Sequence, residues 1–229
     1  AVIAHAGTAD TRVFREVTQL GKELEKIGSR VMGSENHAKV GIIFDWENYW
    51  ALEYTSGPNR DLRYVDQIEQ MYNYFYNKNI AVDMIPIDAD FSKYDLVAAP
   101  VLYMVKDGVA ESLEAYVQAG GTLITTYMSG IVGQSDNVHL GGYPGPLRKM
   151  AGVWVEEIDA LAPEQRNKIR FADGTEEECR LVCDLMHLEG AEEIAQYESD
   201  FYAGMPCVTR NQYKNGTAYY IGTDPDDEF

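Results

Sequence analysis

The sequence predicts an α/β fold with an open, mainly parallel sheet, helices on both faces, and added antiparallel strands in the C-terminal part. Three observations support this fold class. Short apolar runs alternate with amphipathic helical patterns between residues 39 and 130, as in sheets whose crossovers are helices. After about residue 150 the pattern becomes rich in strands and hairpin turns. The chain has 229 residues, 45% of them hydrophobic, which is enough to bury a core.

The elements of the parallel part follow the order β-α-β-β-α-β. The first strand is the continuous apolar run 40–44, typical of a strand that is buried on both faces. A loop rich in aromatic and polar residues is expected at 45–60. The remaining elements are helices at 64–75 and 111–119, the second ended by Gly120-Gly121, and strands at 81–85, 96–99 and 122–126.

The strand-rich part is expected to extend the same sheet with antiparallel strands. Two hairpin turns are indicated, at Asp173-Gly174 and at Asn215-Gly216. The expected strands are 153–155, 168–171, 208–213 and 217–221.

The N-terminal segment is an isolated amphipathic helix at 10–31, which Asp10 or Thr11 could cap. Its apolar residues recur at helical spacing, yet a polar connector with Gly33 separates them from the first strand. Such a stripe needs a surface to pack on, so we expect a piece of a larger protein. We divide the chain into 1–35, a tail of a preceding domain with its connector, and 36–229, one α/β domain.

The composition argues against several classes of partner. A net charge of −18 opposes non-specific binding to nucleic acid and to anionic lipid surfaces. No stretch approaches the ~18 apolar residues of a membrane span, and no signal peptide is recognisable. Cys179, Cys183 and Cys207 have no metal-ligand spacing, which favours a reduced, cytoplasmic protein without a metal or other cofactor.

The end of the first strand carries the strongest candidate residues. Asp45 and Glu47 could form a carboxylate pair for acid/base catalysis. The adjacent Trp46, Tyr49 and Trp50 indicate instead a packing or subunit contact, since aromatic side chains dominate interface energies.

The end of the fourth strand lacks a nucleophile. Tyr127 and Met128 precede Ser129, and the G-x-S-x-G spacing of a nucleophile elbow is absent. We therefore interpret Ser129 as a turn or capping residue. The glycine-rich segment 141–146 is not a phosphate loop, because no Lys-Ser/Thr follows it, and is expected to be a rigid loop that could contact a partner. The histidines His5, His37, His139 and His187 form no metal-binding pair.

Several runs of residues resemble the central domain of family 42 β-galactosidases. The most distinctive is Phe44-Asp45-Trp46-Glu47-Asn48-Tyr49-Trp50, which is similar to the signature that opens that domain. Further runs agree in order and spacing, namely 98–105, 119–130, 138–148, 188–191 and 200–206.

This resemblance implies a flavodoxin-like or class I glutamine amidotransferase-like domain that supports homotrimer assembly. It also implies an upstream (β/α)₈ barrel with two catalytic glutamates, so neither Glu47 nor Glu53 inherits their role. Residues 1–35 would then be the tail and last helix of that barrel. The whole enzyme would hydrolyse terminal β-D-galactosides with retention.

The candidate interface or pocket-rim residues that follow from this interpretation are Asp45, Trp46, Glu47, Asn48, Tyr49, Trp50, His139 and Tyr143. The expected partners are two further copies of the chain and the enzyme's own barrel. Two alternatives stay open: a sugar-binding module using Asp45, Asn48 and Ser129, and an amidotransferase-like enzyme without a recognisable nucleophile.

Overall fold

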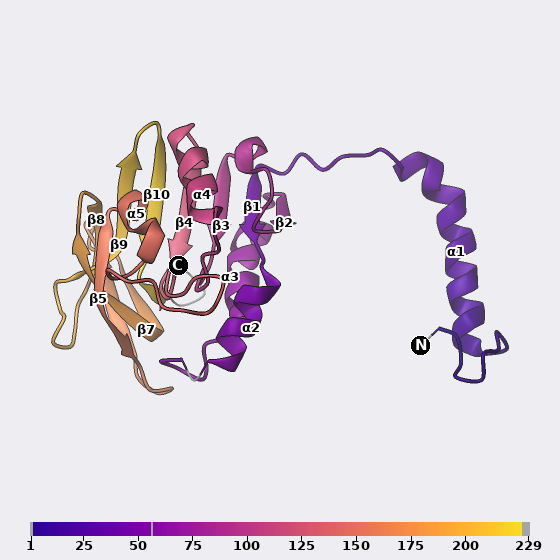
Figure 1. Ribbon diagram of the computed structural model, residues 1–229, viewed down its shortest axis with the longest axis horizontal. Helices are drawn as coiled ribbons and strands as arrows, with labels where there is room; N and C mark the ends of the chain where they lie inside the picture. Colours follow the sequence, from indigo (N-terminus) through magenta and orange to yellow (C-terminus); the bar gives the residue numbers. More distant parts are fainter. Residues whose placement is uncertain (1, 56, 226–229) are drawn as a thin grey trace. The chain divides into compact units, whose positions relative to one another are not determined.

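The computed structural model describes residues 2–55 and 57–225 and divides into two compact units, Ala1–His37 and Ala38–Phe229 (Figure 1). The first unit contains the helix α1 (Arg12–Val31). Thr11 caps it, because its Oγ1 accepts a hydrogen bond from the backbone N of Phe14 at 3.1 Å. None of the 20 residues of α1 is buried, so its apolar stripe is exposed within this unit. The assignment of this helix to a barrel stays a prediction.

The second unit begins with the parallel part of the sheet. Its strands lie in the order β2-β1-β3-β4, and β10 continues the sheet in parallel with β4. The strands are β1 (Val40–Ile43), β2 (Val82–Ile85), β3 (Leu96–Ala99), β4 (Thr122–Thr126) and β10 (Gly216–Ile221). All four residues of β1 are buried, which confirms the interpretation of the apolar run. The predicted α/β fold class is confirmed.

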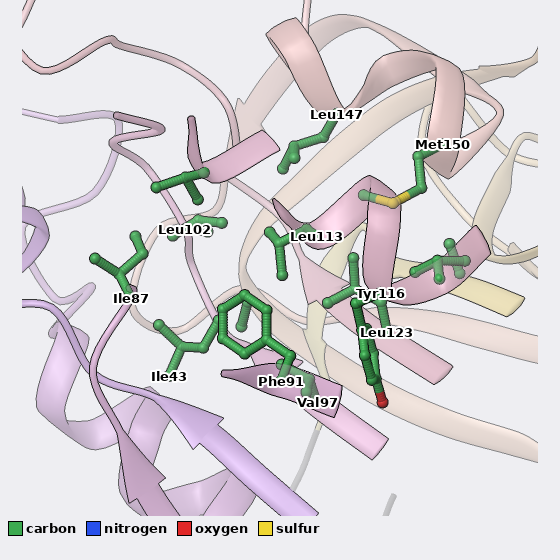
Figure 2. Packing of buried hydrophobic residues seen from close by; sticks show 14 of the residues in the cluster. Ile43, Ile87, Phe91, Val97, Leu102, Leu113, Tyr116, Leu123, Leu147 and Met150 are labelled. Atoms are coloured by element: carbon green, nitrogen blue, oxygen red, sulfur yellow. The ribbon is translucent and has the colours of Figure 1, made fainter. Parts of the chain in front are cut away.

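Helices cover both faces of this parallel part. On one face α4 (Val109–Gln118) and the short α5 (Arg148–Ala151) pack with the 3₁₀ turns η1 (Phe91–Lys93) and η2 (Gly145–Leu147). Figure 2 shows this core, in which Leu113 and Tyr116 of α4 meet Leu123 of the sheet. On the other face α2 (Trp46–Tyr54) and α3 (Tyr64–Asn77) pack over β1 and β3.

The expectation of a loop at 45–60 is wrong, because α2 occupies most of that range. Asp45 caps the helix. The carboxylate of Glu47 in the first turn interacts favourably with the positive end of the helix dipole. Only Asn48 and Leu52 of α2 are buried. A helix that buries so little of one face lacks the apolar stripe on which periodicity depends.

The remaining strands are antiparallel. β5 pairs with β7 off the main path of the sheet, and the others form a closed ring together with β10. Neighbouring strands pair in the order β7-β6-β8-β9-β10. The chain then continues from β10 through Gly222 into β11, and β11 pairs with β7, which closes the ring. Their bounds are β5 (Val153–Ala160), β6 (Asn167–Phe171), β7 (Glu176–Leu188), β8 (Glu192–Tyr197), β9 (Pro206–Tyr213) and β11 (Thr223–Pro225). The antiparallel extension of the sheet was predicted, whereas the strands β7, β8 and β11 were not.

The second predicted hairpin is present with its turn one residue earlier than expected. Tyr213 pairs with Gly216, so Lys214 and Asn215 form the turn and Gly216 begins β10. Lys214 adopts the left-handed conformation, with φ 57°. Gly216 is required by packing, since a Cβ there would lie 2.1 Å from the carbonyl oxygen of Val117.

Candidate functional site

The N-terminus of α2 is tied to the loop that follows β3. Asp45 accepts a hydrogen bond from Asn48 N at 3.1 Å through Oδ2 and binds Lys106 Nζ at 2.8 Å through Oδ1. The Asn48 side chain is fully buried, donates to Val101 O at 3.0 Å and accepts from Met104 N at 2.7 Å. These bonds fix the direction of α2 at the carboxyl edge of the parallel strands.

Both candidate carboxylates share one ammonium group. Lys106 forms ion pairs with Asp45 and with Glu47. Burial lowers the pKa of Lys106, but its hydrogen bonds to the two carboxylates outweigh burial and leave that pKa raised. The arrangement suits a structural ion cluster that orients the first turn of α2 better than an acid/base pair.

One face of α2 presents an aromatic stripe. Trp46, Trp50 and Tyr54 recur at i, i+4 and i+8 and are 60%, 50% and 89% exposed. The rings of Trp46 and Trp50 lie with their centroids 6.2 Å apart. Tyr49 is partly buried and packs against Phe44 and Tyr64. Trp46 also contacts Phe44 and Tyr49, so it joins the exposed stripe to these inner rings.

The loop after β4 presents a second apolar group. Leu140 is 96% exposed and Val138 is 53% exposed at its tip. Backbone bonds hold the loop: His139 N donates to Ile131 O at 2.9 Å and Val155 N donates to Tyr143 O at 3.0 Å. His139 and Tyr143 are partly buried, so their role is to support the loop and not to form its tip.

The glycine-rich part of this loop is also held by Arg148 of α5 and by the close packing of Gly145. Arg148 Nη1 donates to Gly141 O at 2.7 Å. A Cβ on Gly145, where φ is 53°, would lie 2.5 Å from Gly130 O and 3.1 Å from the His139 ring. These contacts are what the glycines and prolines of 141–146 predict for a rigid loop.

The two apolar groups belong to one edge of the domain. Val132 of the loop after β4 forms β-bridges with Met104 and with Val138. Met104 N donates in turn to Asn48 of α2, so the loop that carries Val138 is linked to α2. We call the exposed side chains Trp46, Trp50, Tyr54, Val138 and Leu140 the ridge.

Ser129 is buried and engaged, as expected for a turn residue. Its Oγ donates to Thr126 O at 2.6 Å and accepts from Leu102 N at 3.1 Å. The left-handed residue of this turn is Met128, with φ 57° and a buried thioether. The backbone thus makes a sharp turn at the end of β4, and a side chain without nucleophilic character occupies it.

Sequence reasoning missed several residues of this region. Lys106, Tyr54 and Leu140 were not singled out, because their importance depends on contacts or exposure that only the fold creates. It also missed Asp184, a buried carboxyl on β7 that accepts a hydrogen bond from Tyr220 Oη at 2.7 Å. Burial raises the pKa of Asp184 to about 7.

Within residues 2–55 and 57–225, no group of three or more His, Cys, Asp and Glu side chains is placed to hold a metal ion. No helix in that part of the chain has the length and apolarity to cross a membrane. The three cysteines are free and buried.

Comparison with known proteins agrees with the resemblance. The family model of the β-galactosidase trimerisation domain matches residues 38–229. β-Galactosidase LacZ of Lactobacillus acidophilus is 53% identical over 223 residues, which are 97% of this chain and 33% of that protein. β-Galactosidase BgaP of Planococcus sp. is 49% identical over 234 residues, covering 100% of this chain and 35% of that protein.

Solved structures give the same answer. The crystal structure of a β-galactosidase from Bacillus circulans sp. alkalophilus matches with a TM-score of 0.88 and 47% identity, covering 100% of this chain and 35% of that chain. The chain thus spans about a third of the length of the relatives it matches. The match to the family model over most of the chain shows that it belongs to the β-galactosidase trimerisation domain family.

Proposed function

We propose that this chain assembles a larger β-galactosidase into a homotrimer and that the ridge is one of its contact surfaces. The observation that carries the proposal is the ridge itself, five large apolar side chains exposed on one edge of a domain of this family. Exposed apolar clusters of this kind mark interaction sites in soluble proteins.

The ridge has the properties of an energetic centre in an interface. It contains two tryptophans, the residue type most enriched among side chains that dominate binding energy. The hydrogen bonds around Asn48 and Gly141 hold its two parts in place before any partner binds. A preorganised surface loses little conformational entropy on association, which favours a tight contact.

Neither alternative interpretation gains support from the geometry. A sugar-binding module would need free polar groups at the strand ends. The side chains of Asp45, Asn48 and Ser129 instead form hydrogen bonds with the protein's own backbone and, for Asp45, with Lys106. An amidotransferase-like enzyme would need a nucleophile where Met128 lies.

The remainder of the proposal concerns the whole enzyme. We propose that it hydrolyses terminal β-D-galactosides with retention, using two glutamates of a barrel that precedes residue 36, and that residues 1–35 end that barrel. On this view galactosides reach the protein only through the barrel. The buried free thiols support a cytoplasmic location.

Light scattering tests the assembly proposal. The chain at tens of micromolar is expected to have three times its mass of 25.7 kDa. Trp50→Ser/Leu140→Ser is expected to be folded and monomeric, whereas Phe201→Ser, which also removes an exposed aromatic side chain, is expected to stay trimeric. A ridge variant that remains trimeric would show that the ridge is not a contact surface. A monomeric unmodified chain would overturn the proposal that this domain assembles the enzyme.

A further inference from the structure

Where β4 and β10 lie side by side, the face of the sheet opposite α4 keeps partly exposed side chains in the described part of the chain. Buried and partly exposed residues alternate along β10 and along β4 as far as Thr125, after which Thr126 is buried as well. Leu123 and Ala218 point into the core under α4, while Ile124 and Ile221 point to the opposite face and stay partly exposed. That opposite face is the one on which α3 packs over β1 and β3.

A groove of about 880 Å³ lies between α3 and this partly exposed face. Its walls include Met71, Tyr74 and Lys78 from α3 and the residue after it, and Ile124 and Ile221 from the sheet. Tyr74 is exposed, so the groove combines a solvent-facing aromatic ring with partly exposed aliphatic side chains. Exposed apolar surface of this kind favours an apolar occupant.

The described lining of the groove is close to neutral on a chain whose net charge is −18. Among the described residues that line it, the charged ones are Lys78 and Asp224, and Asp224 accepts a hydrogen bond from Arg180 Nε at 2.9 Å. Two acidic copies repel each other over most of their surfaces, so contact between them is favoured where the charge is lowest.

Cyclic symmetry gives the groove a partner. In a ring of three identical subunits each interface joins two different patches, unlike the self-complementary patch of a twofold dimer. The ridge, if it is a trimer contact, therefore needs a complementary patch elsewhere on the same chain. The ridge is apolar and exposed, and its helix carries the exposed Glu53, whereas Glu47 is already paired with Lys106. The groove is concave and more apolar than polar, and it carries the ammonium group of Lys78.

We infer that the groove between α3 and the exposed face of β4 and β10 receives the ridge of a second copy of the chain. This inference rests on the proposed assembly function and adds the surface to which the ridge binds. Leu140 and Trp50 would enter the groove beside Tyr74, and Glu53 of α2 would face Lys78. Three such contacts in one direction close a ring.

The first test damages the groove at exposed positions that leave the core intact. Tyr74→Glu/Lys78→Glu is expected to be folded and monomeric by light scattering, and Phe201→Glu is expected to remain trimeric. If the groove variant remains trimeric while the ridge variant dissociates, the groove inference is overturned and the assembly proposal stands. If the unmodified chain is monomeric, the assembly proposal fails instead.

The second test joins the two surfaces covalently. Leu140→Cys and Tyr74→Cys chains, carrying different tags and co-expressed, are expected to form a disulfide on mild oxidation that links two chains and no more. The double variant is expected to link three chains, because each copy then carries both thiols. If the Leu140→Cys chain alone forms cross-linked dimers as efficiently as the mixture does, the ridge of one copy contacts the ridge of another and the inference is overturned. A trimer without any cross-link would likewise overturn the inference.

Discussion

Replacing Asp184 by asparagine is expected to remove a pH dependence of stability that this buried carboxyl creates. Asp184 is 1% exposed, and its Oδ2 accepts a hydrogen bond from Tyr220 Oη at 2.7 Å. Burial raises its pKa to about 7, against the opposing effects of the Tyr220 hydrogen bond and of the Met128 backbone. The folded state therefore favours the neutral carboxyl.

The magnitude follows from proton linkage. In the unfolded chain the pKa of an aspartate is about 3.9, so the folded state holds its proton over about three further pH units. Between these two pKa values unfolding releases a proton, and the free energy of unfolding falls by about 1.4 kcal/mol per pH unit. The contribution of Asp184 is thus most favourable below pH 4 and is lost as the pH rises to 7, a change of about 4 kcal/mol in total.

The assay compares unfolding by urea at several pH values for the chain with Asp184 and for Asp184→Asn. The asparagine keeps an oxygen that accepts from Tyr220 but does not titrate. Both chains carry the ridge substitutions Trp50→Ser/Leu140→Ser, so that unfolding is not coupled to assembly. The free energy of unfolding of the variant relative to the parent is expected to rise by about 4 kcal/mol between pH 4 and pH 8.

The control is Asp88→Asn, which removes an exposed carboxylate. Its difference from the parent is expected to change by less than about 0.5 kcal/mol over the same range. A relative stability of Asp184→Asn that does not change with pH would refute the reasoning, because it would mean that Asp184 ionises as easily in the folded protein as in the unfolded chain.

Two further substitutions test how the fold is held. Lys106→Met leaves Asp45 without its cation and is expected to lower the free energy of unfolding by about 2 kcal/mol in urea, and a loss below about 0.5 kcal/mol would show that the ion cluster does not hold α2. Gly216→Ala places a Cβ against the Val117 carbonyl and is expected to cost about 3 kcal/mol, whereas Gly174→Ala, at a turn with no atom within 4 Å, is expected to cost about 1 kcal/mol. Equal losses for the two glycine variants would contradict the packing argument.

Much of the fold could be predicted because many of its strands have a recognisable local sequence pattern. The run 40–44 is apolar throughout because the strand is covered on both sides. The last hairpin is recognisable from the turn residues between its two strands. The strand β7 was missed because a left-handed residue, Leu181, with φ 63°, interrupts its alternation. The helix α2 was missed because tertiary contacts of Asn48 replace the apolar stripe that a sequence pattern would show.

The candidate site was only partly accessible to the same reasoning. Aromatic residues after the first strand drew attention to Trp46 and Trp50, yet their exposure depends on which side of α2 faces the sheet. The partnership of Lys106 with Asp45 spans 61 residues and leaves no local signal. Nothing in the sequence around Leu140 predicts that its side chain is exposed. Its position at the tip of the loop depends on the backbone hydrogen bonds that hold the loop.

The carboxyl edge of the parallel strands explains how such a fold can serve assembly. In doubly wound sheets this edge binds ligands, because loops diverge there and leave polar groups free. In this chain Asn48 and Ser129 bind the backbone of the loop after β3, and Met128 fills the sharp turn after β4. Once those polar groups are used internally, the edge has little left with which to hold a small polar molecule. What it presents outward is the apolar ridge, and an apolar surface on a rigid support is suited to bind another protein surface.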